Sequence, residues 1–598
     1  MRKKQSVPPT RAVTGSDPVS LVADPHALGS PRIPGRWKLI AGAILVAVAT
    51  LALMLVTSPR LAIVWDEGYT LGREARIRDW VRALLDPARF ASTWRPPSLE
   101  LVQDDGMRPP TPPEIDTRAE LLGPRAMHWF WPFGREEPHG HPPFYAILGM
   151  AGDLLAPGWQ ALPRARVGPI LAFSLVAGAL YASLARRFGP WPAALGAGAW
   201  VLQPQLFGHG HYATTDGPLA SLWVGATLAF AEAAIPPTTV PGATGARRPP
   251  PRWRWVVVFG VLAGWAADTK LTGWFLPVPL LAWTALYRSR RGAWTLAVGG
   301  VLAVATLYAF NPPWWSDPVG GVERFLRSNL TRGRTIPIPV QFFGRTYLTP
   351  VESLPWYNSL AWTAIATPVG FLTLTVAGLA RAAGRARSES LGVLFVLGFA
   401  APLVLRALPH TPGHDGVRQL LPALGGLALV ASLGAASAIE RLGRWGKLVI
   451  IAALAEGAAG VALMMPVPLS YFSPAVGGLP GATSLGMEPT YFWDALSDDA
   501  LDWLDLNTPP GQKVKFATEP TSWLYLRDTG RLRPGFLPWE PGRYAWYVLQ
   551  NRPGAFWPFD RALIDEVEPV FVVRKWGVPL VWIFPYGEFE VRQRRPSP

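Results

Sequence analysis

Long apolar runs, separated by short clusters of arginine and lysine, dominate the pattern of the chain. The first run, from Trp37 to Thr57, has no small-residue cleavage site behind it, so it predicts a retained anchor helix rather than a signal peptide. A bilayer core of about 30 Å needs about 20 apolar residues in a helix. Eleven transmembrane helices are therefore predicted, over residues 37–57, 167–185, 190–208, 213–234, 254–268, 271–287, 293–310, 359–380, 391–408, 417–437 and 448–465.

A further apolar stretch, from Pro142 to Ala156, is short and carries Asp153. Short cytoplasmic loops of membrane proteins collect Lys and Arg. If this stretch is left out of the count and the N-terminus lies inside, the basic clusters between the runs fall on the cytoplasmic side. Counting the stretch as a span would place them outside. Residues 142–156 therefore predict an interfacial or re-entrant helix.

The ends of the chain differ from its apolar middle. Residues 1–36, rich in Pro, Ser and charge, predict a disordered cytoplasmic segment. Residues 37–465 form the predicted transmembrane module, in which 58–166 is a long first external loop with interfacial helices. Residues 466–598 contain no run of membrane length, and they predict an external C-terminal domain.

The C-terminal residues show the periodicities of both strands and a helix. Residues 513–518, 570–573 and 581–584 have the pattern of strands, and 494–506 that of a short amphipathic helix. The predicted fold class is thus an all-α polytopic membrane protein with a small external α/β domain at its C-terminus.

Composition supports a membrane protein and excludes several other classes. Only 16% of the 598 residues are charged, against about 25% in an ordinary soluble protein, and 49% are hydrophobic. The basic residues do not gather on one face among polar residues, so a nucleic-acid partner is not expected, and membrane lipids are. The absence of Cys excludes disulfides, thiolate-bound zinc, iron–sulfur clusters and thiol nucleophiles.

Charge and histidine are distributed unequally between the two sides of the predicted membrane. The net charge of +15 falls almost entirely in the segments placed inside, and the rest of the chain is close to neutral. All the histidines but His26 lie in outer segments or at their ends: His128, His139, His141, His209, His211, His410 and His414. The chemistry is therefore expected on the outer side.

The adjacent acids Asp66 and Glu67 follow the first run directly. Two like charges at a membrane surface are costly to bury together, and such a pair suits the removal of a proton from an acceptor hydroxyl. The alternative is a solvated helix start, because acids are favoured in the first turn of a helix.

Other ionisable residues lie at the outer mouths of predicted helices. Arg166 could hold a phosphate, or could extend its charge to the interface from an apolar stem. Asp216 could take part in the reaction, or it could cap the helix that begins at this position. Asp268 and Lys270 lie between two runs with almost no loop, where charges are costly and often functional. Arg418 begins the tenth run.

Several of these residues stand in motifs of one membrane enzyme class. Asp66-Glu67, His141-Pro142-Pro143 and Thr215-Asp216-Gly217-Pro218-Leu219 occur in this order and in these places. The sequence over about residues 37–500 resembles the polyprenyl-phosphate-sugar-dependent glycosyltransferases of the integral-membrane C superfamily. It is most similar to the bacterial relatives of protein O-mannosyltransferases and of lipid A aminoarabinose transferases, which are family 39-like enzymes.

The resemblance implies roles for individual residues. Asp66 matches the catalytic base, with Glu67 and Asp216 as further catalytic acids. Basic positions suited to the donor phosphate match Arg166, Lys270 and Arg418. The expected substrate-binding residues are His141, His211, Asp268 and His414. No segment resembles the sugar-binding trefoil domain of eukaryotic mannosyltransferases, which puts a protein acceptor in doubt.

The implied function is transfer of one sugar, with inversion, from a polyprenyl-phosphate-linked donor to a hydroxyl of a glycan, lipid or protein acceptor. The resemblance implies a bacterial cytoplasmic (inner) membrane, with the N-terminus cytoplasmic and the active site and C-terminal domain periplasmic or external. The alternative is a lipid-linked sugar transporter or polysaccharide polymerase. A transporter is expected to place polar residues near mid-membrane, and only Glu456 fits that expectation.

A metal-dependent enzyme is the third possibility. Asp66, Asp216, His209 and His211 could supply oxygen and nitrogen ligands to a divalent metal ion. In an extended segment, the spacing of His209 and His211 places both side chains on one face. No other cofactor is predicted.

Overall fold

The computed structural model describes residues 35–93, 117–131, 141–235, 252–335, 338–413, 415–518, 523–536 and 541–594. Residues Ile33–Pro598 form one compact unit. Residues 1–34 of the segment predicted to be disordered lie outside the described residues, as does His414.

Six helices of the described residues are long and apolar enough to cross a membrane. They are α1 (Arg36–Thr57), α8 (Ala161–Phe188), α14 (Arg290–Phe310), α18 (Ser390–Ala407), α19 (Leu421–Leu442) and α20 (Arg444–Met464). The other predicted spans coincide with helices that are shorter, interrupted or, in the case of the 19-residue α11, less apolar, and the count of eleven spans stays a prediction. These helices are α9 (Pro190–Leu202), α10 (Pro204–His211), α11 (Asp216–Ala234), α12 (Trp253–Ala267), α13 (Pro277–Leu286), α16 (Asn358–Ile365) and α17 (Val369–Gly384).

Two of the predicted spans are divided into two helices each: 190–208 into α9 and α10, and 359–380 into α16 and α17. A proline lies at each break, and proline lacks the N–H that a helix interior needs. Pro204 begins α10, where the side chain of Gln203 accepts the first free backbone N–H groups. Pro368 precedes α17, and here the cap comes from another helix. The Glu456 carboxylate on α20 accepts the backbone N–H groups of Val369 and Gly370, both at 2.7 Å. Glu456, the one polar residue that favoured a transporter, therefore serves as a helix cap.

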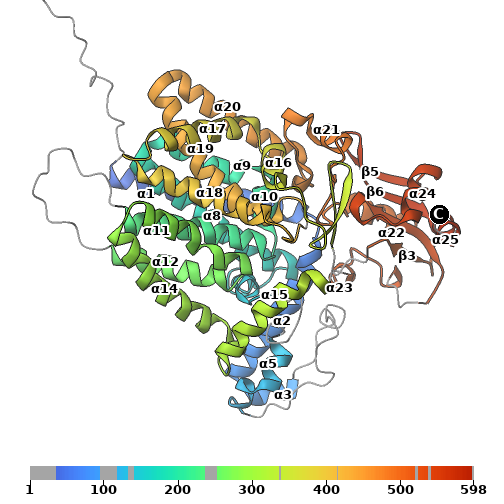
Figure 1. Ribbon diagram of the computed structural model, residues 1–598. Helices are drawn as coiled ribbons and strands as arrows, with labels where there is room; N and C mark the ends of the chain where they lie inside the picture. Colours follow the sequence, from blue (N-terminus) through green and yellow to red (C-terminus); the bar gives the residue numbers. More distant parts are fainter. Residues whose placement is uncertain are drawn as a thin grey trace, which may run out of the picture. The chain divides into compact units, whose positions relative to one another are not determined.

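The middle of the bundle is α19, whose apolar length is fully buried. It packs against α9, α11, α17, α18 and α20, and Figure 1 shows α17, α18 and α19 side by side. Glycines permit the closest of these contacts. A Cβ on Gly434 of α19 would lie 1.9 Å from the Leu374 oxygen, and one on Gly378 of α17 would lie 2.0 Å from the Val430 oxygen. Small residues are the usual means by which membrane helices approach each other.

The described residues of the first predicted external loop, 58–93, 117–131 and 141–166, are largely helical. They contain α2 (Trp65–Leu85), α3 (Pro87–Thr93), α5 (Pro124–Phe130), α6 (Phe144–Gly149) and α7 (Ala151–Leu155). The last two helices cover the stretch predicted to be interfacial. Together they span residues Phe144–Leu155, about 18 Å at 1.5 Å per residue, which is shorter than a bilayer core.

After α14, the helix α15 (Pro318–Thr335) leads into an antiparallel hairpin of β1 (Ile338–Phe342) and β2 (Arg345–Thr349). The two residues of its turn, Phe343 and Gly344, both have positive φ, as a tight two-residue hairpin requires. The hairpin lies beside the C-terminal residues, since the N–H of Gly344 in the turn and the side-chain amide of Gln341 in β1 both donate to the Gly486 oxygen, at 2.9 and 3.0 Å.

The C-terminal residues contain the predicted strands and one more. A four-stranded sheet has the order β3 (Lys513–Phe516), β4 (Tyr544–Gln550), β6 (Val578–Pro585), β5 (Phe571–Lys575). The β3–β4 pair is parallel and the others are antiparallel. The sequence missed β4, and the predicted helix at 494–506 begins later, as α22 (Asp498–Asn507). Helices α21 (Gly478–Ser484), α23 (Trp523–Asp528), α24 (Pro558–Glu566) and α25 (Tyr586–Gln593) complete this region. Its external position and independence as a domain stay predictions.

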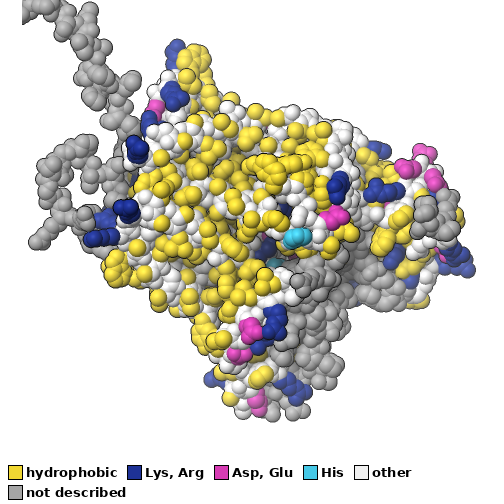
Figure 2. Space-filling view, in the orientation of Figure 1, with side chains coloured by type: hydrophobic (Ala, Val, Ile, Leu, Met, Phe, Trp, Pro, Cys, Tyr) yellow, Lys and Arg dark blue, Asp and Glu magenta, His cyan; other side chains and the backbone are white. Residues whose placement is uncertain are grey.

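Apolar side chains cover the outside of the bundle. Large hydrophobic residues of α1, such as Trp37, Leu45 and Val56, are mostly exposed. Figure 2 shows hydrophobic side chains across the face of the helical part, with Lys, Arg, Asp and Glu towards its margins. This is the surface of a protein whose surroundings are lipid, and the chain is an integral membrane protein.

Candidate active site

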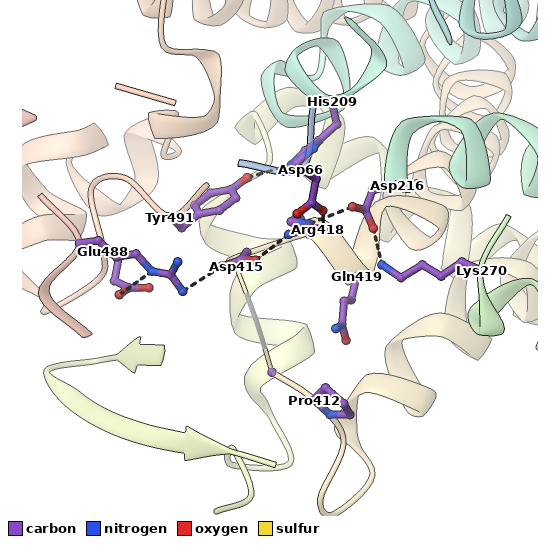
Figure 3. A network of polar contacts seen from close by, with 12 residues as sticks. Asp66, His209, Asp216, Lys270, Pro412, Asp415, Arg418, Gln419, Glu488 and Tyr491 are labelled. Atoms are coloured by element: carbon purple, nitrogen blue, oxygen red, sulfur yellow. Dashed lines mark hydrogen bonds and ion pairs between the residues drawn. The ribbon is translucent and has the colours of Figure 1, made fainter. Parts of the chain in front are cut away.

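One arginine joins three of the acids at the outer helix mouths. Arg418, in the turn before α19, donates from Nε to Asp216 at 2.8 Å and from Nη1 to Asp415 at 2.7 Å, and its Nη2 pairs with Asp66. Its guanidinium lies 4.0 Å from the centre of the Phe492 ring. Figure 3 shows the three carboxylates converging on this side chain. We call these residues and those bonded to them the Arg418 network.

A second cation belongs to the same network. Lys270, between α12 and α13, donates from Nζ to Asp216 at 2.6 Å. Asp216 at the start of α11 therefore bridges two cations, one on each carboxylate oxygen (Figure 3). Four residues selected from the sequence, Asp66, Asp216, Lys270 and Arg418, are thus brought together.

The members of the network differ in their exposure. The Asp66 side chain is 29% exposed, whereas that of Asp216 is 1% exposed and that of Arg418 is 7% exposed. Asp66 lies in the first turn of α2, just after the segment that connects α1 to α2. Among the three carboxylates on Arg418, it is therefore the one most open to an incoming ligand.

Residues from the C-terminal region complete the network, and the sequence did not reveal them. Arg552 lies 2.9 Å from Asp415 Oδ1 through its Nη2 and 3.8 Å from Glu488 through its Nε. Its guanidinium lies 5.1 Å from the centre of the Trp493 ring. Asp415 stood within a selected motif, but nothing near Arg552 in the sequence marks it.

The charges of the network are balanced. Asp66, Asp216 and Asp415 carry three negative charges, and Lys270, Arg418 and Arg552 carry three positive charges. Glu488 is a further buried acid: burial raises its pKa to about 7, although Arg552 and the Gly554 N–H act in the opposite direction. Asp415 and Gly416 both have positive φ, which Gly and Asp tolerate better than most residues, and this turn aims Asp415 at both arginines.

A hydrogen-bond chain behind the network involves His209. The Tyr491 hydroxyl donates to Gln205 Oε1 at 2.5 Å, so the His209 Nε2, at 3.2 Å from the same hydroxyl, is assigned as the donor to it. Gln205 in turn donates to the backbone oxygens of Leu469 and Tyr471. His209 therefore joins α10 to the segment that carries Phe492 and Trp493.

Glu67, although it follows Asp66 directly, lies in a separate and closed cluster. Its two carboxylate oxygens accept from Arg166 Nε and Nη2, both at 2.7 Å. The other N–H groups of Arg166 donate to the backbone oxygens of Ser58, Leu61 and Ala62 at 2.9–3.1 Å. All five guanidinium N–H groups are used, and the two side chains are at most 1% exposed. The structure does not bring this pair into the Arg418 network.

Other predicted residues also bond to the protein itself. His211 contacts the Phe207 and Met54 oxygens at 2.7 and 3.1 Å and joins α10 to α1. Asp268 is fully buried, and its carboxylate accepts from Asn311 at 3.1 Å. His141, just before α6, is partly exposed.

The residues considered for a metal do not converge. Among the described residues, no group of three or more His, Asp and Glu side chains is arranged to hold a metal ion. The cation between Asp66 and Asp216 is the Arg418 guanidinium, and His209 and His211 bond to Tyr491 and to backbone oxygens respectively.

The model of one known protein family matches part of the chain. Residues 141–315 match the model of the dolichyl-phosphate-mannose-protein mannosyltransferase family, and this segment contains Asp216 and Lys270. This match agrees with the resemblance to the protein O-mannosyltransferases that was drawn from the sequence motifs. No curated protein matches the sequence significantly.

Solved structures with a similar chain path are distant in sequence. ArnT from Cupriavidus metallidurans, bound to undecaprenyl phosphate, is 16% identical, with a TM-score of 0.44 over 92% of this chain and 98% of that chain. The oligosaccharyltransferase AglB from Archaeoglobus fulgidus, with an inhibitory peptide and a dolichol-phosphate, is 13% identical, with a TM-score of 0.42 over 84% of this chain and 69% of that chain.

Proposed function

We propose that the protein transfers a single hexose or pentose from a polyprenyl-phosphate-linked donor to an acceptor hydroxyl, with inversion, and that Asp66 is the base. The observation that carries the proposal is the Arg418 network. In this network, the Arg418 guanidinium pairs with three carboxylates, those of Asp66, Asp216 and Asp415, and Asp66 is the most exposed of the three. A base and a phosphate-binding cation thus share one site.

The donor phosphate is proposed to replace Asp66 on Arg418. Asp66 is the carboxylate on this guanidinium that solvent reaches most easily, so it can leave at the least cost. The phosphodiester of the donor carries one negative charge, as the displaced carboxylate does, and the charge balance of the network is preserved. The exchange frees Asp66 to accept a proton from the acceptor hydroxyl.

In the proposed reaction, the acceptor oxygen forms a bond to the anomeric carbon while the bond from that carbon to the phosphate oxygen breaks. The bonding electrons leave with the polyprenyl phosphate, whose extra negative charge Arg418 and Lys270 stabilise. The proton of the hydroxyl passes to Asp66. A single displacement inverts the anomeric centre.

The remaining predicted residues take supporting roles in this proposal. Asp216 holds Arg418 and Lys270 in place, since each of its oxygens bonds one of them. Glu67 and Arg166 fix the start of α2, and so the position of Asp66. Substrate contact by His141, His211, Asp268 and His414 stays a prediction.

The proposed location is the outer face of a bacterial inner membrane, with the N-terminus cytoplasmic and the C-terminal region external. The polyprenyl tail of the donor would lie against the apolar helices, and the acceptor would be a glycan, a lipid or a protein.

The test uses the purified full-length protein in lipid nanodiscs. Polyprenyl-phosphate mannose, glucose, galactose and arabinose analogues are supplied in turn with a mixture of candidate acceptors, and release of free polyprenyl phosphate is measured. We expect release from one donor class by the wild type and release about 10³-fold slower by Asp66→Asn. NMR of the product should show an inverted anomeric centre. Release from no donor would contradict the transferase proposal and support the transporter alternative.

A further inference from the structure

Arg552, which joins the Arg418 network from the C-terminal region, has no role in the proposed reaction. Asp415 is divided between two arginines: its Oδ2 accepts from Arg418 at 2.7 Å, and its Oδ1 lies 2.9 Å from Arg552. Arg552 touches neither Asp66 nor Asp216 in these contacts. Among these contacts, Asp415 is the residue that links Arg552 to Arg418.

The position of Arg552 is fixed from several sides. Its side chain is 7% exposed, its guanidinium lies against Trp493, and its Nη2 donates to the Pro339 oxygen of β1 at 3.4 Å. Glu488 lies 3.8 Å from its Nε. An arginine held in this way has little freedom to leave Asp415, and it is well suited to hold that carboxylate in one orientation.

The charges show what Arg552 contributes. With Arg552 present, the negative charge of Asp415 is shared between two cations. Without Arg552, that charge would rest on Arg418 alone, which also pairs with Asp66 and Asp216. Arg418 would then be turned towards Asp415 and would have less positive potential to offer to an anionic ligand.

We propose that Arg552 is a positioning residue, which holds Asp415 so that Arg418 presents Nη2 to the donor phosphate. The inference rests on the proposed function, and it extends the functional site into the C-terminal region. Arg552 acts on donor binding more than on the chemical step, because it reaches the site through Asp415 and the cation that holds the donor phosphate, and it does not contact the base Asp66.

The experiment measures KM for the donor and kcat in Arg552→Gln, Arg552→Lys and the control Arg592→Gln. Arg592 is a matched arginine of the same region, 8% exposed and paired with Glu566 at 3.0 Å and Glu588 at 2.6 Å, outside the network. We expect Arg552→Gln to raise KM about tenfold with little change in kcat, and Arg552→Lys to restore much of the loss. Arg592→Gln should match the wild type in both constants.

A double-mutant cycle with Asp415→Asn tests the route. If Arg552 acts through Asp415, its substitution has no further effect on KM once the Asp415 charge is absent. A full Arg552 effect in that background would overturn the inference, as would a KM in Arg552→Gln equal to that of Arg592→Gln. If Arg552→Gln does not fold, the same cycle is run with Arg552→Lys, for which a KM increase that disappears with Asp415→Asn is expected. Turnover by the wild type separates these outcomes from failure of the proposed function, in which no variant turns over.

Discussion

Asp66 and Glu67 are neighbours in the first turn of α2, and each pairs with an arginine, yet the two pairs are built differently. Glu67 meets Arg166 in a closed cluster, where every N–H of the guanidinium has a partner within the protein. Asp66 meets Arg418 in the open network, where three carboxylates share one guanidinium and one of them remains 29% exposed.

Under the proposed function, the difference separates a structural ion pair from one that takes part in the reaction. In the closed pair, no N–H donor of Arg166 is left for a ligand. The hydrogen bonds of the pair stabilise the connection between α1 and α2 instead. In the open network one carboxylate can be exchanged for another anion, so the arginine can bind substrate without leaving a buried charge unpaired. Two acids that look equivalent in the sequence are therefore expected to respond to substitution in opposite ways.

Turnover provides the largest contrast. Asp66→Asn removes the proposed base and should lower the rate of sugar transfer by about 10³-fold, since general bases typically contribute 10²–10⁴-fold. Glu67→Gln should keep a rate per folded molecule of the same order as the wild type. Release of polyprenyl phosphate, normalised to folded protein, measures both. Equal losses in the two variants would show that the closed pair also belongs to the catalytic machinery.

Stability provides the reverse contrast. Glu67→Gln leaves the buried Arg166 without its counter-charge and should cost about 3–5 kcal/mol, the usual loss when one partner of a buried pair is removed. Asp66→Asn should change stability little, because its side chain is partly exposed and Arg418 keeps two other carboxylates. Thermal unfolding followed by tryptophan fluorescence tests this order, and a lower midpoint for Asp66→Asn than for Glu67→Gln would contradict it.

Lys270→Met tests whether the open network binds the donor through both cations. Its Nζ bonds Asp216, which Arg418 also holds, so folding should be retained. We expect KM for the donor to rise about tenfold with a smaller change in kcat. Lys575→Met is the matched control, because Lys575 Nζ donates to the Met465 oxygen outside the network. An unchanged KM in Lys270→Met would leave Arg418 as the phosphate-binding cation and remove Lys270 from the proposal.

A third acid of α2, Glu74, should produce the smallest effect, through pH. Its side chain is buried, and burial raises its pKa from 4.5 to about 8, with Arg78 acting in the opposite direction. A carboxyl with a higher pKa in the folded protein than in the unfolded chain stabilises the fold below about pH 4.5, and this contribution is lost as the pH rises to about 8. Glu74→Gln should therefore flatten the fall in the thermal midpoint between pH 5 and 8. Asp66→Asn should retain that fall, and parallel curves for Glu74→Gln and the wild type would refute the assignment.

The helices were predictable because their signal is local. A long apolar run must satisfy its backbone hydrogen bonds within itself in lipid, so composition and length are enough to find α1, α8, α14, α18, α19 and α20. The β4 strand was missed because its residues, Tyr544–Gln550, do not alternate between apolar and polar, and its place in the sheet depends on β3 and β6. The capping role of Glu456 was missed because the capped helix, α17, is distant in the sequence.

The sequence by itself determined that the protein is a polytopic membrane chain, and it singled out Asp66, Asp216, Lys270 and Arg418 as residues worth attention. Only the tertiary structure decided which of the adjacent acids opens to solvent. Successive residues of a helix differ by about 100° in direction, so Asp66 and Glu67 face different neighbours, and those neighbours are Arg418 and Arg166 from other helices. The inclusion of Arg552 likewise depended on packing, since ion pairs between distant segments exist only once the fold brings them within a few ångströms.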